Sequence, residues 1–223
     1  MYNETVMMVK DGDGAPCGRL LFNAKKIISV RDSTLEKEYV EGKDYTYKDG
    51  VITLLEGAKL PYLTKEQLLG KNLPSNITPM PTSKTETQKL LFTETPYIFE
   101  RQLAVTYVYN KEDWTMTMLG LAEDKLPKTI EKLKKGDALK VLVYGDSIAA
   151  GCNSSRVLNV EPYTPTWAEL IKLGLEQKYD STVTVINSSV AGMTSQWGAE
   201  NAQSIAAPHK PDLAIISFGM NDG

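Results

Sequence analysis

The sequence predicts an α/β protein of two parts, a β-sandwich over residues 1–120 and a layered, helix-containing parallel sheet over residues 139–223. Three observations support this fold class. The first half contains short β-rich runs divided by turn signals, with no long helical period. In the second half, apolar strand-like runs alternate with helical ones. A chain of 223 residues also has room for two modest domains.

The β-rich runs of the first half begin with GRLLFNAKKIISVRDS (18–33) and KEYVEGKDYTYKDGVITLLEG (37–57). Within the second run, Asp49-Gly50 separates YTYK from VITLL, which is a strong signal for a β-hairpin. The run QLAVTYVYN (102–110) alternates apolar and polar positions and predicts another strand. Several short strands with this turn spacing favour a β-sandwich.

Two connecting segments complete the first half. LTKEQLL (63–69) predicts a short helix, and the Pro/Ser/Thr-rich stretch at 70–88 predicts a long loop. We expect a domain boundary near residue 121 and a linker over 121–138. The linker holds a short helix, because Pro127 suits a first helical turn and a glycine follows the lysines of its last turn.

The second half has a βαβαβ order, which predicts parallel strands joined by right-handed crossovers. In such sheets, ligands bind beyond the carboxyl ends of the strands. The Thr166-x-x-Glu169 pair is a capping box at the start of the first helix. The expected elements, in order, are strand 139–145, helix 164–179, strand 181–189, helix 194–207 and strand 211–219.

Composition excludes several functions. The net charge is −3, and no Lys/Arg cluster alternates with aromatic residues, so we expect no nucleic-acid partner. Cys17 and Cys152 fit no metal-ligand spacing, and we expect no metal and no cofactor. The start of the chain lacks the features of a secretory signal, and no stretch of ~18 apolar residues occurs. We therefore expect no membrane partner and a cytoplasmic location. An internal Met taken as the start would hide a signal peptide, so export is not excluded. The sequence leaves the oligomeric state open.

Three short turns at the expected strand ends could carry chemistry: GDSIAAGCNSS (145–155), SSVAGMTSQWG (188–198) and GMNDG (219–223). An ester-cleaving serine needs an exposed hydroxyl, a nearby base and donors for the oxyanion. Ser147 can project from its turn as a nucleophile. Gly192 can offer a backbone N–H, and Asn221 a side-chain NH₂, to the oxyanion.

The segments YGDSI, NSSVAGMTSQWG and ISFGMNDG resemble blocks I, II and III of the SGNH (GDSL-type) hydrolases, in order and at plausible spacing. The resemblance covers residues 139–223 and implies a flavodoxin-like three-layer domain that is incomplete at its C-terminus. It also implies that Ser147 is the nucleophile, and that the Ser147 N–H, the Gly192 N–H and the Asn221 side chain form the oxyanion hole. Ile148 replaces the leucine of the GDSL name, which is a small change.

One departure from the family matters more. The family base is a histidine in a late Asp-x-x-His block, and no such block follows in these residues. The single histidine, His209, precedes the third strand, whereas Asn221 follows it, and a strand of that length separates its ends by ~20 Å. We therefore do not expect His209 to be the base. We expect the chain to be a fragment that is inactive or very weak by itself.

Other residues near the turns have both functional and structural interpretations. Asp146 and Asp222 are expected to support the turns by bonding their backbones. Trp197 and Asn153 are candidate substrate contacts, although core packing and a solvated loop explain them as well. Cys152 is expected to be inert, because no cationic neighbour is visible to lower its pKa.

Two functional hypotheses follow. The first is a serine esterase acting on small O-acyl esters, O-acetyl groups above all, on carbohydrate, because the β-rich leader is similar to those of some carbohydrate esterases. The second is a non-catalytic glycan-binding module whose hydrolase half is degenerate. A third and weaker idea is that the leader only packs on the hydrolase half and shapes its cleft, with no ligand of its own.

Overall fold

The computed structural model describes residues 1–82, 88–117, 120 and 123–223. The chain divides into two compact units. The first unit contains Met1–Thr117 and Val160–Pro162, and the second contains Met118–Asn159 and Tyr163–Gly223. The boundary expected near residue 121 lies outside the described residues.

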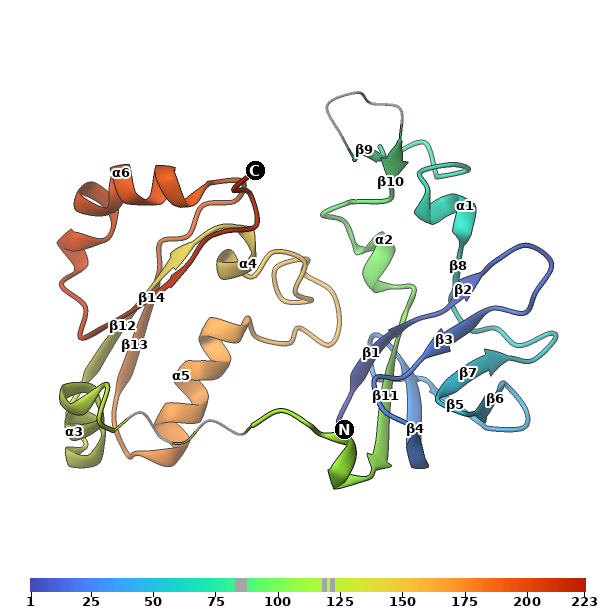
Figure 1. Cartoon of the computed structure of the whole chain (residues 1–223), viewed down its shortest axis with the longest axis horizontal. Helices are drawn as coiled ribbons and strands as arrows, with labels where there is room; N and C mark the ends of the chain where they lie inside the picture. Colours follow the sequence, from blue (N-terminus) through green and yellow to red (C-terminus); the bar gives the residue numbers. More distant parts are fainter. Residues whose placement is uncertain (83–87, 118–119, 121–122) are drawn as a thin grey trace. The chain divides into compact units, whose positions relative to one another are not determined.

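The first unit contains two larger sheets (Figure 1). Its expected strands are confirmed, and the long runs at 18–33 and 37–57 are each divided by turns into shorter strands. The four-stranded sheet is antiparallel and has the order β1 (Glu4–Met7), β11 (Gln102–Tyr109), β4 (Ala24–Asp32) and β5 (Glu38–Tyr39). The five-stranded sheet has the order β6 (Tyr45–Lys48), β7 (Val51–Leu54), β3 (Cys17–Arg19), β2 (Val9–Lys10) and β8 (Leu63–Thr64).

Smaller elements connect these sheets. The helix expected in LTKEQLL is confirmed as the single turn α1 (Lys65–Leu68). The other small elements are β9 (Met80–Pro81), β10 (Lys89–Leu90), α2 (Pro96–Phe99) and the 3-10 turn η1 (Lys111–Asp113). Part of the long loop expected at 70–88 lies outside the described residues.

The two larger sheets of the first unit share one apolar core. Leu103 and Val105 contribute from β11, and Ile52 and Leu54 contribute from β7. The β-sandwich class stays a prediction, because β2 and β8 pair in parallel, whereas sandwich sheets are antiparallel. The hairpin between β6 and β7 is confirmed: Asp49 and Gly50 both have positive φ, +50° and +81°, as a type I′ turn requires.

The second unit contains the parallel sheet. Its order is β13 (Val183–Asn187), β12 (Leu139–Gly145), β14 (Leu213–Ser217), and both pairings of β12 are parallel. The predicted parallel sheet is therefore confirmed. The helices of this unit are α3 (Pro127–Lys135), α4 (Ser147–Ala150), α5 (Trp167–Lys178), α6 (Ser195–Ile205) and the 3-10 turn η2 (Ala207–His209).

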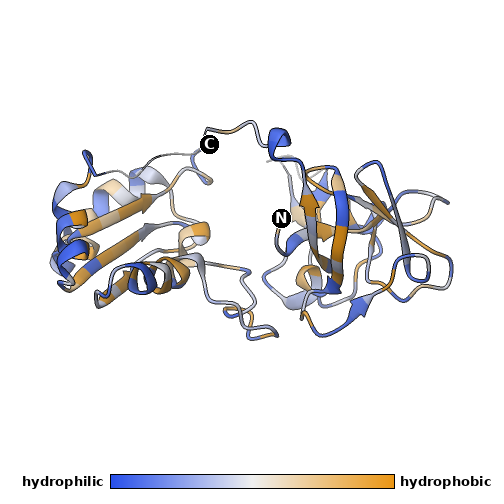
Figure 2. Cartoon of the chain, turned by 90° about the horizontal axis from the view of Figure 1, so that it is seen from below, coloured by the Kyte–Doolittle hydropathy of each residue, from blue (hydrophilic) through white to orange (hydrophobic). Residues whose placement is uncertain are grey.

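Helices cover both faces of the parallel sheet. Figure 1 shows α5 and α6 on opposite sides of β12, and Figure 2 shows the apolar strands between them. Alternate residues of β12 explain this arrangement, because successive side chains of a strand point to opposite faces. Val143 packs against Ala168 of α5, whereas Tyr144 packs toward α6 and donates to the Gly198 carbonyl at 3.0 Å.

The helix start and helix end predicted from capping residues in the sequence are also confirmed. Thr166 and Glu169 form both hydrogen bonds of a capping box at the start of α5. Gly136 ends α3 in the left-handed conformation, with φ of +74°. Across the described parts of the chain, no helix is long and apolar enough to span a bilayer.

Candidate active site

Three turns meet at the carboxyl edge of the parallel sheet. The Val190 N–H donates to the Gly145 carbonyl at 2.9 Å, which joins the turn after β13 to the turn after β12. The Asp146 N–H donates to the Ser217 carbonyl at 3.1 Å, which joins β12 to the end of β14. These bonds are possible because parallel strands end at the same edge of a sheet.

Ser147 occupies the first position of the single-turn helix α4. Asp146 is the N-cap of this helix, and its buried carboxylate accepts the Ile148 N–H at 3.0 Å. Ser147 itself is half-buried, and its hydroxyl has no hydrogen-bond partner in the described part of the chain. The hydroxyl therefore remains available to an incoming group.

The tight turn before Ser147 requires glycine. A Cβ atom at Gly145 would lie 2.1 Å from the Ser217 carbonyl oxygen and 2.6 Å from the Ala149 Cβ. Contacts this short exclude a side chain, because the first neighbour is backbone. Gly145 thus lets β12 and β14 come close enough to bring Ser147 to the sheet edge.

Gly192 and Asn221 are brought together by a single side-chain bond. The Asn221 Nδ2 donates to the carbonyl of Met193, the residue after Gly192, at 2.9 Å. Gly192 has φ of +78°, a conformation that glycine adopts without strain, and the space beside its Cα is open. An amide nitrogen carries two N–H bonds, so Asn221 keeps one for another acceptor.

Asp222 joins the third turn to helix α6. Its carboxylate accepts the Ser195 N–H at 2.7 Å, at the first turn of that helix. The Ser195 side chain and this backbone N–H hold the pKa of Asp222 below its usual range. The carboxylates of Asp146 and Asp222 therefore both bond backbone N–H groups of turns and helix starts.

We predict that the Asp222 contribution to stability depends on pH. Since its pKa is lower in the folded state, the folded protein binds fewer protons, and stability from this group is fully present above its unfolded pKa of about 3.9. That stability is lost as the pH falls through the folded pKa. Urea unfolding of the protein and of Asp222→Asn from pH 2 to 7 tests this, because asparagine accepts the same N–H without titrating. A difference between the two proteins that is constant down to pH 2 would contradict the prediction.

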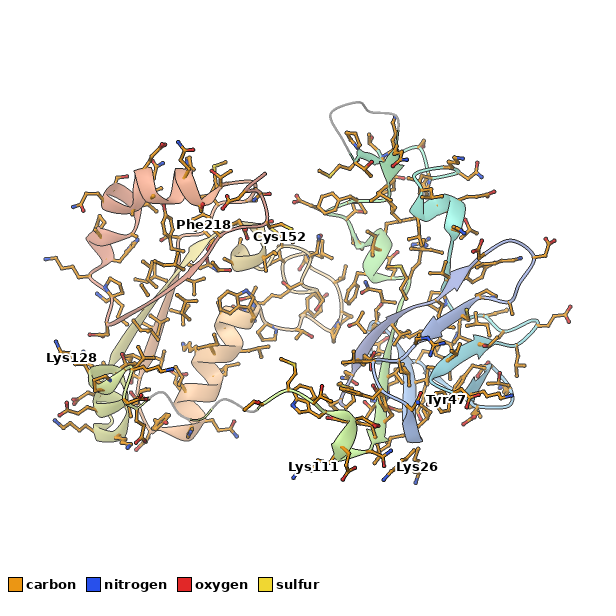
Figure 3. All side chains as sticks on the ribbon, in the orientation of Figure 1. Lys26, Tyr47, Lys111, Lys128, Cys152 and Phe218 are labelled. Carbon is orange, nitrogen blue, oxygen red and sulfur yellow. The ribbon has the colours of Figure 1, made fainter. Side chains whose placement is uncertain are left out.

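Trp197 belongs to helix α6, and Asn153 belongs to the loop after α4. The Trp197 ring is half-buried, and its centroid lies 6.3 Å from that of the Tyr144 ring. Tyr144 in turn contacts the ring of Phe218 edge-on, with a centroid distance of 5.1 Å. Phe218 is labelled in Figure 3. Asn153 is exposed, with φ of +65°, in the loop after α4. Contact of either residue with substrate stays a prediction.

His209 makes a contact that the sequence does not reveal. Its carbonyl accepts the Lys140 Nζ at 3.1 Å, which ties η2 to the amino-terminal end of β12. Its ring Nε2 lies 3.2 Å from the hydroxyl of Ser188, the residue after β13. Within the described residues, the histidine ring thus bonds Ser188 and not Ser147.

Two further side chains bond the helix that begins at Ser147. The Trp167 indole N–H donates to the Ile148 carbonyl at 2.9 Å, and the Asn187 Nδ2 donates to the Ala149 carbonyl at 2.9 Å. Both carbonyls belong to α4. The position of Asn187 at the end of a strand, immediately before the second turn, is the one signal that could have indicated it.

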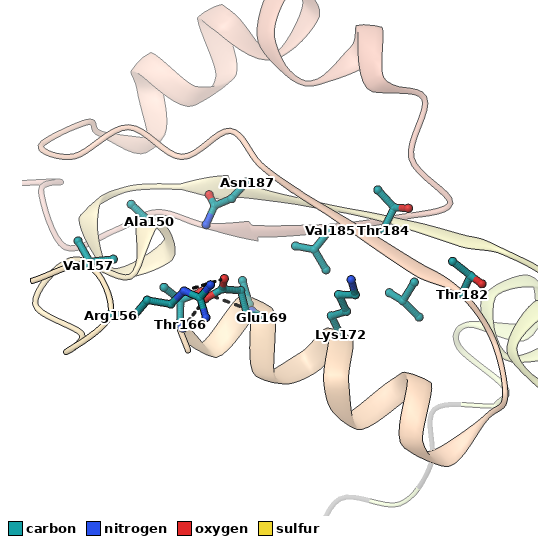
Figure 4. Close-up of a pocket in the computed structure, with 12 residues that line it drawn as sticks. Ala150, Arg156, Val157, Thr166, Glu169, Lys172, Thr182, Thr184, Val185 and Asn187 are labelled. Atoms are coloured by element: carbon teal, nitrogen blue, oxygen red, sulfur yellow. Dashed lines mark hydrogen bonds and ion pairs between the residues drawn. The ribbon is translucent and has the colours of Figure 1, made fainter. Parts of the chain in front are cut away.

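No cofactor site emerges from the described residues. Among them, no group of three His, Cys, Asp or Glu side chains could hold a metal ion. An open pocket of about 590 Å³ lies between α5 and the outer edge of β13 (Figure 4). Within it, Arg156 pairs with Glu169 at 3.4 Å, and Lys172 is a further cation.

The three turns lie in the part of the chain that is similar to known proteins. Residues 143–223 match the GDSL-like lipase/acylhydrolase family. This match supports the resemblance of the region to the SGNH/GDSL hydrolase superfamily.

Several characterised esterases are similar to this region. An arylesterase of Vibrio mimicus is 36% identical over 84 residues, 38% of this chain and 38% of that protein. Thioesterase 1/protease 1/lysophospholipase L1 of Escherichia coli K12 is 31% identical over 83 residues, 37% of this chain and 35% of that protein. Esterase TesA of Pseudomonas aeruginosa is 35% identical over 89 residues, 39% of each chain. The chain therefore covers well under half the length of these relatives.

A solved structure is also similar in part. It is a two-domain esterase (CEX) active on acetylated mannans, which is 29% identical and has a TM-score of 0.40. The match covers 46% of this chain and 26% of that protein.

Proposed function

We propose that the protein is a serine ester hydrolase with Ser147 as its nucleophile. The observation that carries this proposal is the position of Ser147: it begins a helix at the carboxyl edge of the sheet, with a hydroxyl that no described residue engages. The similarity of this region to an esterase and acylhydrolase superfamily supports ester hydrolysis as the reaction.

The oxyanion hole would consist of the Ser147 N–H, the Gly192 N–H and the second N–H of Asn221. A helix N-terminus supplies backbone N–H groups without partners inside the helix, which suits the first of these donors. The bond from Asn221 to the Met193 carbonyl supports the Gly192 and Asn221 donors, because it holds the Asn221 side chain beside the turn that contains Gly192.

The reaction has two steps. In the first, the Ser147 Oγ attacks the ester carbonyl carbon, the bond to the alcohol oxygen breaks, and the alcohol leaves with the serine proton. In the second, water attacks the acyl-enzyme, the acid is released, and Ser147 regains its proton. Each step needs a base that accepts a proton and returns it.

We infer that this base comes from a further segment of a longer protein. The single histidine of these residues bonds Ser188.

An exposed apolar groove of about 390 Å³ runs between α6 and β14, and it is lined by Tyr144, Ala202, Ile216 and Phe218. Ile216 on β14 is 71% exposed, and β14 pairs with β12 alone among the described strands. An apolar groove beside an unpaired strand edge suits a further βα unit.

For the substrate, we propose short acyl esters, acetyl groups above all, on carbohydrate. The turns around Ser147 and Gly192 are short and rich in Ser, Asn and Gly, which suits a small acyl group and a polar alcohol. The resemblance of the β-rich first unit to leaders of carbohydrate esterases supports a carbohydrate alcohol.

Covalent labelling by a fluorophosphonate tests the nucleophile. The Ser147 Oγ attacks phosphorus, fluoride leaves, and the proton goes to solvent. We expect one adduct on Ser147 by mass spectrometry, its loss in Ser147→Ala, and faster labelling by an ethyl than by an octyl phosphonate. Even without a base, an oxyanion hole leaves about 10³-fold acceleration over water.

Ser188→Ala is the matched control, because it removes the serine that bonds the histidine within the described residues. We expect this variant to label at Ser147 like the unchanged protein. An adduct on Ser188, or equal labelling of many serines, would contradict the nucleophile assignment.

A second candidate function is a glycan-binding module without catalysis. The bond between His209 and Ser188 favours it, because that bond leaves Ser147 without a base among the described residues. Under this alternative, the protein binds an acetylated oligosaccharide in calorimetry but forms no adduct at Ser147 with the fluorophosphonate.

A further inference from the structure

Helix α4 depends on its surroundings for its position. It has four residues, Ser147–Ala150, and a single helical turn is not stable by itself in water. The last carbonyls of any helix also lack partners inside the helix. The Gly151 N–H at the end of the turn bonds the Ile148 carbonyl. Outside groups that bind the carbonyls of α4 therefore help to hold the turn, and with it the Ser147 hydroxyl and N–H, in place.

Two side chains from elsewhere in the second unit bind carbonyls of α4. Trp167, at the start of α5, donates its indole N–H to Ile148, and Asn187, at the end of β13, donates its amide N–H to Ala149. Figure 4 shows Asn187 extending from the strand beside the segment that holds Ala150.

Asn187 also bonds the turn that carries Gly192. Its Oδ1 accepts the Ser189 N–H at 3.1 Å. A bond from Asn to the N–H two residues ahead is a common turn motif and by itself would be local. The bond to Ala149 is different, because it crosses 38 residues of sequence. One amide thus joins the nucleophile helix to the start of the second turn.

We propose that Asn187 is a positioning residue for ester hydrolysis, setting the nucleophile helix against the turn that bears the second oxyanion donor. This inference rests on the proposed function of Ser147. The residue type follows from the geometry: the site needs a donor toward the Ala149 carbonyl and an acceptor toward the Ser189 N–H. A neutral amide supplies both, whereas an ionised carboxylate supplies only the acceptor.

The test compares two substitutions at this position. Asn187→Ala removes both bonds. Asn187→Asp keeps the acceptor for Ser189 and, at neutral pH, loses the donor toward Ala149. Thr184→Ala is the matched control, because Thr184 is an exposed residue of the same strand and no hydrogen bond of its side chain occurs in the described structure. Trp167→Phe removes the other bond to α4 without affecting the second turn.

The first readout is fluorophosphonate labelling of Ser147, resolved into the rate constant of bond formation and the half-saturating concentration. We expect the rate constant to fall about tenfold or more in both Asn187 variants, since small displacements of reacting groups are costly. The half-saturating concentration should change little. Thr184→Ala should label like the unchanged protein. A rate constant unchanged in both Asn187 variants would overturn the proposal.

The second readout is amide hydrogen exchange, which needs no activity. We expect faster exchange at residues 148–152 in both Asn187 variants, and faster exchange at 188–193 in Asn187→Ala only. Unchanged exchange in both segments would also overturn the proposal, even in variants that are less stable overall. If the unchanged protein forms no adduct at Ser147, the proposed function fails, and the exchange pattern alone then decides whether Asn187 joins the two segments.

Discussion

Replacing Gly145 with alanine is expected to destabilise the second unit by about 3 kcal/mol or more, because overpacking against backbone cannot be relieved by a rotamer change. The new Cβ would lie 2.1 Å from the Ser217 carbonyl oxygen. To make room, β12 and β14 must separate at their carboxyl ends, which breaks the bond from the Asp146 N–H to Ser217. Thermal unfolding measures the loss of stability, and fluorophosphonate labelling of Ser147 should slow by about a hundredfold with it.

Gly174→Ala is the control for this substitution. Gly174 lies inside helix α5, and apart from its two chain neighbours and the backbone of its own helix no atom lies within 4 Å of the Cβ that alanine would add. Alanine in a helix interior is more favourable than glycine by about 0.5–1 kcal/mol, so we expect a small gain in stability. Equal effects of the two substitutions would show that the contact with Ser217 does not determine the conformation after β12.

Leu103→Ala is expected to lower the free energy of unfolding of the first unit by about 2–5 kcal/mol, the usual cost of emptying a buried leucine site. Leu103 is 1% exposed on β11 and belongs to the core that the two larger sheets share. Removing the Leu103 side chain therefore weakens the packing between the two sheets as well as the packing of β11 itself. Urea unfolding followed by tyrosine and tryptophan fluorescence measures it.

Val108→Ala on the same strand is the matched comparison. Val108 is 44% exposed, and surface substitutions usually change stability by less than about 0.5 kcal/mol. If both substitutions cost the same, Leu103 does not lie in a core shared by the two sheets.

Local patterns predicted most elements well. The β-strands, the capping box at Thr166, the hairpin at Asp49-Gly50 and the parallel order of the second half are all confirmed. These features depend on neighbouring residues, so the sequence contains their cause. The division of 18–33 into β3 and β4 was missed, because strand breaks depend on pairing partners far away in the chain.

The candidate site was predictable in part. Ser147, Gly192 and Asn221 follow successive strands, and parallel pairing brings their turns to one edge. The bonds of Asn187 and Trp167 to α4 could not be predicted, because each joins segments that meet only when helices pack on the sheet. The bond between His209 and Ser188 has the same origin.

The sequence by itself determined the order of strands and helices, the three turns at the strand ends and the family resemblance of the second half, because periodicity, caps and motifs are local. Only the tertiary structure decided which groups meet at those turns. It joined Asn221 to the Gly192 turn, Asp222 to the start of α6 and Asn187 to the nucleophile helix. Each of these bonds depends on distances across the sheet, which are determined when the strands pair and the helices pack.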